Sequence, residues 1–153
     1  MNYTLLYNIF IPVILAIIIN SLSFGLGWNK KSKDKKMNPL LPPGYVIGIV
    51  WIIILGLLGY VHYEIFKLHN NHITFTSLYV AFFILFCLAY PFLTLGYQEK
   101  IGLLINLITL ILAFILSLLI IIQSKYIFIF TIPLLLWVTY VNFVFVIECS
   151  EFY

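Results

Sequence analysis

Five stretches of the chain are almost wholly apolar, and each is about as long as a helix that crosses a membrane. A helix rises 1.5 Å per residue, so about 20 apolar residues span the roughly 30 Å of hydrocarbon in a bilayer. The stretches show none of the short alternation that a transmembrane β-barrel requires. Helices and closed barrels alone satisfy every backbone polar group inside lipid. The sequence therefore predicts an all-α fold, an integral membrane bundle of five transmembrane helices.

The residue content excludes a soluble protein. Of the 153 residues, 64% are hydrophobic and 8% are charged, and the mean hydropathy is +1.15. Soluble domains carry about 25% charged residues, which cover their surface. Five of the eight lysines lie in one loop, a pattern that indicates membrane topology and contact with lipid headgroups, so no nucleic-acid partner is expected.

One transmembrane domain, residues 1–153, is expected, with spans near 4–27, 44–67, 74–97, 101–123 and 126–148. Segment 28–43 is the long connection between the first two spans, and the other connections are so short that neighbouring helices must run antiparallel. The first span could instead be a cleaved signal peptide. Its start carries no positive charge and no small-residue cleavage site precedes the lysines, so a retained helix is expected.

Lysine distribution predicts the orientation of the bundle. The loops after the first and third spans hold six lysines, at positions 30, 31, 33, 35, 36 and 100, and the opposite side holds Lys67 and Lys125. Cytoplasmic loops carry the excess of lysine and arginine in membrane proteins. We therefore expect a multi-pass protein whose N-terminus is non-cytoplasmic and whose first loop and C-terminus are cytoplasmic.

The stretch LPPGYVIGIVW at 41–51 marks the start of the second span. Pro42 and Pro43 end any helix before them and suit the first turn of a new one. At 100° per residue, one side of that helix carries Gly44, Gly48, Trp51, Leu55, Gly59 and His62. The glycines either admit another helix, from this chain or from a second copy in a homodimer, or leave room for a ligand beside Trp51. Spacing alone favours helix packing.

Two tryptophans lie deep within predicted spans, Trp51 in the second and Trp137 in the fifth. An indole N–H in lipid needs a partner, so both are expected to face the bundle interior. Asn20, Cys87, Asn106 and Asn142 are isolated polar residues within spans, for which hydrogen bonds between helices are expected. No paired carboxylates, His/Cys cluster or Ser/His/Asp set is present, so we expect no hydrolytic site, no metal site and no required cofactor.

Several motifs resemble those of the tryptophan-rich sensory protein family, also called the translocator protein or peripheral-type benzodiazepine receptor family. LPPGYVIGIVW followed by GLLGYVHYEIFK is similar to the family's second helix. AYPF at 89–92 is similar to the W-P-P segment of its third helix, and IPLLLW at 132–137 to its fifth-helix P-x-hydrophobic-x-W motif. The resemblance extends over essentially the whole chain.

The resemblance implies that the chain binds a porphyrin such as protoporphyrin IX, or another apolar small molecule, in a pocket within the five helices and under the first loop. It would act in the membrane lipid as a sensor, scavenger or carrier. It also implies a light- and oxygen-dependent breakdown of the porphyrin in which Trp51 and Trp137 are the photochemical residues. The ligand-binding residues implied are Trp28, Pro42, Pro43, Ile47, Gly48, Trp51, Leu55, Cys87, Tyr90, Trp137 and Tyr140.

This chain departs from the family pattern at three of those positions. Cys87 and Tyr90 stand where the third helix of the family has asparagine and tryptophan, and Leu55 stands where tyrosine or phenylalanine is common. The family's cholesterol motif at the end of the fifth helix closes on lysine or arginine, and neither residue follows Lys125. Specific cholesterol binding is therefore not expected, although a sterol- or lipid-binding transporter is the alternative function.

Overall fold

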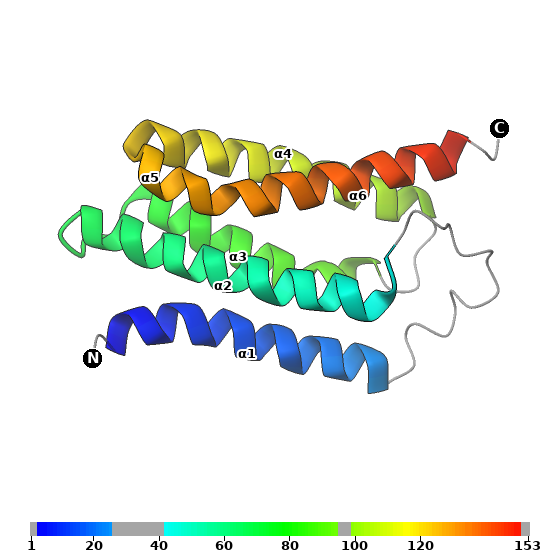
Figure 1. The fold of residues 1–153 in the computed structure, drawn as a ribbon, viewed down its shortest axis with the longest axis horizontal. Coiled ribbons are helices and arrows are strands. Elements are labelled where there is room, and N and C mark those ends of the chain that lie inside the picture. Colours follow the sequence, from blue (N-terminus) through cyan, green and yellow to red (C-terminus); the bar gives the residue numbers. More distant parts are fainter. Residues whose placement is uncertain (1–2, 26–41, 95–98, 151–153) are drawn as a thin grey trace.

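The computed structural model describes residues 3–25, 42–94 and 99–150, and these residues form helices joined by turns (Figure 1). Five helical segments of the described residues are long and apolar enough to cross a membrane, which confirms the prediction of an all-α membrane bundle. The elements are α1 (Tyr3–Gly25), α2 (Gly44–Leu68), α3 (Phe75–Thr94), α4 (Glu99–Gln123), α5 (Lys125–Phe128), the 3₁₀ turn η2 (Ile129–Thr131) and α6 (Ile132–Ser150).

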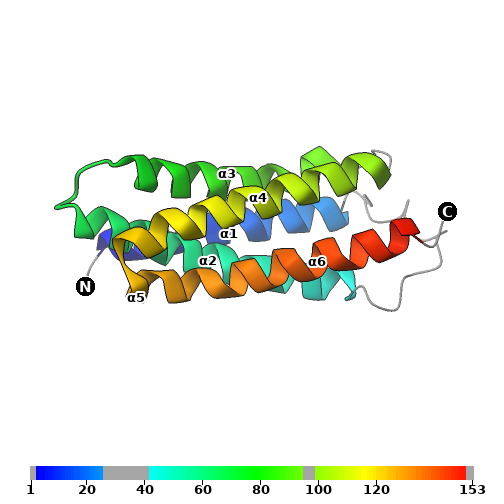
Figure 2. The same cartoon turned by 90° about the horizontal axis from the view of Figure 1, so that it is seen from above.

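Consecutive long helices run antiparallel, and the bundle is elongated along them (Figures 1 and 2). Helix α1 forms one edge and packs chiefly on α2, with a smaller contact to α3. Helix α4 lies between α3 and α6. Only 11% of the apolar window of α1 is buried, against 28–39% in the other four spans, so α1 is the peripheral helix.

The core forms where α2, α3, α4 and α6 meet. Its largest fully buried side chains include Ile54, Phe83, Leu116 and Leu134, one from each of these helices. The outer faces of the spans carry exposed leucine, isoleucine and phenylalanine, which suits hydrocarbon rather than water.

The glycines of α2 hold α1 close. A Cβ added to Gly59 would lie 2.9 Å from the carbonyl carbon of Asn8 and still closer to its oxygen, and one added to Gly56 would lie 3.3 Å from Val13. Such small residues allow two helix backbones to approach each other in a membrane. The glycine side of α2 is thus covered by α1 of the same chain, which is the helix-packing alternative of the sequence analysis.

A hydrogen bond joins the same two helices within the bilayer. His62 Nδ1 donates to Asn8 Oδ1 over 2.6 Å, and Asn8 Nδ2 donates to the carbonyl of Thr4 over 2.8 Å. Both side chains are fixed by these bonds, so they define the register of α1 on α2 in addition to the glycine contacts.

The segment predicted as one span at 126–148 is interrupted near its start. Helix α5 is followed by η2 before α6 begins, and Pro133 lies in the first turn of α6. Proline has no N–H to donate and is tolerated in a first turn, where that donor has no partner anyway. Helix α2 contacts this segment mainly through η2 and α5.

We predict that Gly59→Ala lowers the free energy of unfolding by about 1–3 kcal/mol, because the new methyl group overlaps the α1 backbone. Thermal unfolding in detergent, followed by circular dichroism, measures the change. The control is Gly102→Ala in α4, where an added Cβ meets nothing within 4 Å. Alanine in place of glycine within a helix raises stability by up to about 1 kcal/mol. Equal stability of the two variants would contradict the close packing of α1 on α2.

Candidate functional site

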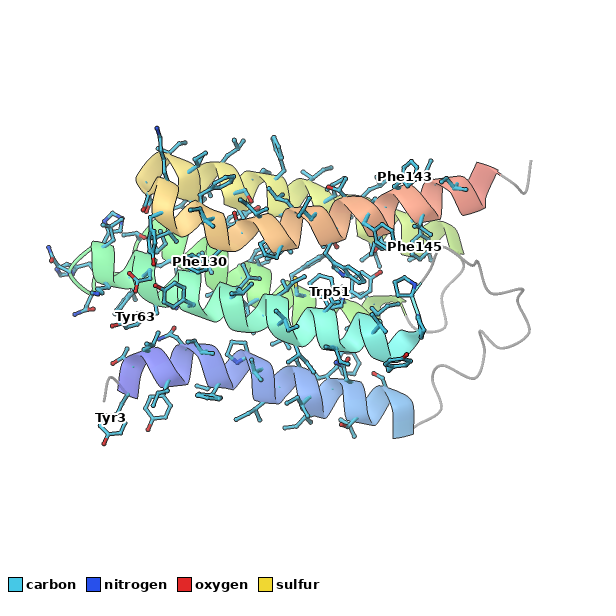
Figure 3. All side chains as sticks on the ribbon, viewed as in Figure 1. Tyr3, Trp51, Tyr63, Phe130, Phe143 and Phe145 are labelled. Carbon is cyan, nitrogen blue, oxygen red and sulfur yellow. The ribbon has the colours of Figure 1, made fainter. Side chains whose placement is uncertain are left out.

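A cavity of about 190 Å³ lies between α2, α3, α4 and α6. Figure 3 shows Trp51 and Phe145, two of its lining residues, between the ribbons of α2 and α6. Helix α6 packs on α4, whereas α2 meets the last span, formed by α5, η2 and α6, mainly at η2 and α5. The space between α2 and α6 therefore remains open as the cavity. Its lining comprises Pro42, Ile47, Trp51, Tyr90, Asn106, Thr109, Trp137, Val138, Val141, Asn142 and Phe145.

Aromatic rings form much of the cavity wall. The ring centroids of Trp51 and Tyr90 lie 6.3 Å apart with the planes tilted by 30°, so α2 and α3 are joined through these two side chains. Trp137 forms the wall on α6, and its ring lies 5.9 Å from that of Tyr140, which borders an outer groove instead. Flat, electron-rich walls of this kind suit an aromatic ligand, because offset ring contacts contribute about 0.5–1.5 kcal/mol beyond apolar burial.

Polar groups from three helices meet at the same cavity. Tyr90 Oη donates to Asn106 Oδ1 over 2.6 Å, which links α3 to α4. Asn142 Nδ2 donates to the carbonyl of Asn106 over 3.1 Å and to that of Val138 over 2.8 Å, which links α4 to α6. The cavity therefore combines an apolar wall with a few oriented polar groups, as small-molecule sites do.

Three buried polar atoms of residues that line the cavity have no hydrogen-bond partner among the described residues: Trp137 Nε1, Asn106 Nδ2 and Asn142 Oδ1. Burying such an atom unpaired costs about 1–3 kcal/mol. The sequence analysis expected the indole of Trp137 to face the interior and the two asparagines to bond between helices. The structure adds that each also keeps one unused donor or acceptor.

Five residues implied by the resemblance line this cavity together: Pro42, Ile47, Trp51, Tyr90 and Trp137. Leu55 and Cys87 instead line a space of about 40 Å³ against α1, on which Trp51 and Tyr90 also border. Gly48 faces Asn20 of α1. Three others are placed elsewhere: Tyr140 borders an outer groove, Pro43 is the exposed N-cap of α2, and Trp28 is outside the described residues.

Sequence reasoning did not assign six lining residues to the site: Asn106, Thr109, Val138, Val141, Asn142 and Phe145. Two of them were visible in the pattern, since Val141 and Phe145 follow Trp137 at intervals of four and so share its helix face. Asn106 and Asn142 were recognised as polar residues within spans. Nothing in the sequence distinguishes an asparagine that only joins helices from one that also faces a cavity.

Two further hollows lie on the outer surface of the bundle. One of about 290 Å³, between α1 and α3, is lined by exposed side chains such as Ile11 and Leu85. Another of about 410 Å³ is bordered by exposed Ile53 and Leu136. Both are larger than the central cavity and open on the outer surface of the bundle. Among the described residues, no group of three His, Cys, Asp or Glu could hold a metal ion.

Comparison with known proteins gives a family match. A family model described as the TspO/MBR family matches residues 8–146, which is most of the chain. No curated protein and no solved structure matches the sequence.

We predict that Tyr90→Phe lowers the free energy of unfolding by about 0.6–2 kcal/mol, because Asn106 Oδ1 then loses its donor from α3. Chemical unfolding in mixed micelles measures the loss. Tyr79→Phe is the matched control, since it removes a hydroxyl that donates over 3.2 Å to the carbonyl of Leu112, away from the cavity. If Tyr90→Phe lowers the free energy of unfolding no more than Tyr79→Phe does, the hydrogen bond between Tyr90 and Asn106 adds little to the stability of the bundle.

Proposed function

Because the chain belongs to the TspO/MBR family, we propose that it binds a porphyrin or a related flat apolar ligand between Trp51 and Trp137. The chain is an integral, multi-pass membrane protein of that family. Binding in the bundle would serve as a sensor, scavenger or carrier of the ligand. The observation that carries the proposal is that indoles from α2 and α6, far apart in the sequence, border one cavity.

The chemistry of the lining supports a ligand that is apolar and aromatic. Burial of apolar surface contributes about 25 cal/mol per Å² removed from water. Trp51, Tyr90 and Trp137 add ring faces that a macrocycle could stack against, and Ile47 and Phe145 supply further apolar contact. The asparagines of α4 and α6 would then fix the orientation of the ligand.

The size of the cavity sets a condition on porphyrin binding. Its volume of about 190 Å³ is below the roughly 300–1,000 Å³ typical of pockets for drug-sized ligands, and a tetrapyrrole is larger than the cavity. A bound macrocycle must therefore extend past Pro42 at the start of α2, or α6 must move away from α2. The second movement would break few contacts between α2 and α6, because α2 meets the α5–η2–α6 segment mainly at η2 and α5.

We predict that protoporphyrin IX quenches tryptophan fluorescence saturably in nanodiscs, and that Trp51→Phe raises the apparent Kd about five- to tenfold. The reason is the loss of indole contact area at the cavity wall. Trp28→Phe, at the edge of the first loop, is expected to change the Kd less. Absorbance of the porphyrin follows the titration independently of the tryptophan signal.

Three outcomes of this titration count against the proposal. Absence of saturable quenching in the unmodified protein contradicts porphyrin binding. Equal Kd values for Trp51→Phe and Trp28→Phe contradict the placement of the ligand at Trp51. Displacement of the porphyrin by a sterol at lower concentration would favour the alternative, a sterol- or lipid-binding transporter.

The same pair of indoles supports a light-dependent activity as a second stage of the proposal. An electron-rich indole beside an excited macrocycle can donate an electron to it and recover that electron, while dioxygen is the oxidant that breakdown of the porphyrin consumes. Under illumination, we expect loss of porphyrin absorbance that is slower in Trp51→Phe and Trp137→Phe at equal occupancy. Loss at an unchanged rate in both variants would indicate ordinary photobleaching.

We also propose that the turn between α2 and α3 is non-cytoplasmic and that the C-terminus is cytoplasmic, on the distribution of lysines. His72 is exposed in that turn. A His72→Cys variant, with Cys149 replaced by serine, should react with a membrane-impermeant maleimide added from the non-cytoplasmic side of oriented vesicles. Reaction only from the cytoplasmic side would reverse the orientation.

A further inference from the structure

The hollow of about 290 Å³ between α1 and α3, called here the α1–α3 hollow, is polar at one end and apolar along the rest. Helices α1 and α3 both begin at the end of the bundle that holds the α2–α3 turn (Figure 1). Asn8 therefore lies nearer that end than Leu15, by about 10 Å at 1.5 Å per residue. His62 of α2 is hydrogen-bonded to Asn8 and lines the same polar end. The hollow thus has the polarity of a lipid, with one polar end and an apolar length.

The hydrogen bonds of Asn8 determine which ring nitrogen of His62 carries a hydrogen. Asn8 Nδ2 donates to the carbonyl of Thr4 over 2.8 Å, so Oδ1 is the amide atom that faces His62 Nδ1 at 2.6 Å. An amide oxygen accepts hydrogen bonds and cannot donate them, so Nδ1 bears the hydrogen. In the neutral ring, Nε2 is then an acceptor.

This acceptor is accessible, unlike the unpaired atoms at the central cavity. His62 Nε2 has no hydrogen-bond partner among the described residues, and the buried side-chain atoms without a partner there belong to Asn106, Trp137 and Asn142. The His62 ring is half-buried and stacks on that of Phe66, with centroids 6.4 Å apart and planes tilted by 12°. A molecule in the α1–α3 hollow can therefore donate a hydrogen bond to Nε2.

The rest of the lining limits the chemistry of that molecule. The hollow is lined by no lysine, arginine, aspartate or glutamate, so an ionic group inside it would meet no opposite charge in an apolar setting. Its walls beyond the polar end are mostly branched aliphatic side chains: Ile11, Leu15, Ile84, Leu85 and Leu88. A flexible acyl chain can follow such a ridged wall more closely than a rigid ring system can. The molecule that fits is neutral, donates one hydrogen bond and carries an acyl chain.

We infer that the α1–α3 hollow is a lipid site, separate from the central cavity, that takes a diacylglycerol from the surrounding bilayer. The lipid hydroxyl donates to His62 Nε2, and one acyl chain runs between α1 and α3 past Ile11 and Leu85. Phosphatidylcholine is excluded from this arrangement, because it has no hydroxyl to donate and carries charges that the lining does not pair. Occupancy of this site does not require a ligand between Trp51 and Trp137.

Competition against a photoactivatable diacylglycerol tests the inference on the full chain in phosphatidylcholine nanodiscs. The probe carries a diazirine in one acyl chain, and mass spectrometry of the digested protein locates the label, which we expect on residues 11–15 and 84–88. The competitors are dioleoylglycerol and its methyl ether, in which a methyl group replaces the hydroxyl hydrogen. Dioleoylglycerol should halve the labelling at a mole fraction about three- to tenfold lower than the ether, the effect of one hydrogen bond inside a membrane.

Variants assign this preference to His62. His62→Phe keeps a flat ring beside Phe66 but removes the acceptor, so the two competitors should become equal within about twofold. His69→Phe is the matched control, because it makes the same substitution at a side chain that bonds to Gln123 over 3.0 Å, outside the hollow, and it should keep the preference. Ala81→Phe places a ring within the lining and should lower the labelling of residues 11–15 and 84–88.

Nuclear magnetic resonance of the histidine nitrogens gives a second readout on the unmodified protein. The chain has three histidines, so the His62 signals are assigned by their loss in His62→Phe. Dioleoylglycerol should shift the ¹⁵N signal of His62 Nε2, because that nitrogen gains a donor, whereas the methyl ether should leave it in place.

Several outcomes overturn the inference. Labelling spread evenly over the spans removes the site, and equal competition by dioleoylglycerol and its ether leaves a hollow that any acyl chain fills. A preference that persists in His62→Phe, or one that is lost equally in His69→Phe, removes the role of His62. Competition by cholesterol at a lower mole fraction than dioleoylglycerol replaces the acylglycerol with a sterol. If His62→Phe does not fold, the two competitors and the ¹⁵N shift on the unmodified protein still decide.

Discussion

The need to satisfy backbone hydrogen bonds inside lipid governs this molecule. Hydrocarbon offers no partner for an N–H or a carbonyl, so each span must be helical, and the connections between spans must be confined to the ends of the bundle. Positions 70 and 71 show the consequence at one such end. Asn70 and Asn71 adopt left-handed backbone conformations, with φ of 53° and 63°, and so turn the chain sharply from α2 into α3. Asparagine adopts this conformation more readily than most residues.

Lipid also changes what holds the helices together. Leucine gains little by moving from acyl chains to another helix, so close packing and polar contacts become the specific forces. Helix α1 illustrates both, because it is mostly exposed and yet is fixed by Gly56, Gly59 and the bond between His62 and Asn8. Trp51 lies on the same side of α2 as the glycines, where it borders a small space against α1 and extends toward Tyr90 of α3 and the central cavity.

The cavity follows from an uneven contact along the fifth segment. Helix α6 packs along α4, whereas α2 contacts mainly η2 and α5. The helices therefore leave a space near Trp51 and Trp137. A polar network fills only part of that space. Tyr90, Asn106 and Asn142 link α3, α4 and α6, but three of the buried donors and acceptors stay unpaired. The same side chains thus link the helices of the bundle and line the cavity.

The sequence by itself determined the fold class, because span length and apolar content leave a membrane helix bundle as the structure that satisfies the backbone. It also singled out Trp51 and Trp137, since a deep indole must face the interior. Only the tertiary structure decided between the two explanations of the α2 glycines, because a helical period of 100° cannot say which neighbour occupies each side. The same limit applies to Asn106 and Asn142, whose unpaired atoms result from the meeting of α4 and α6 and from no local pattern in either helix.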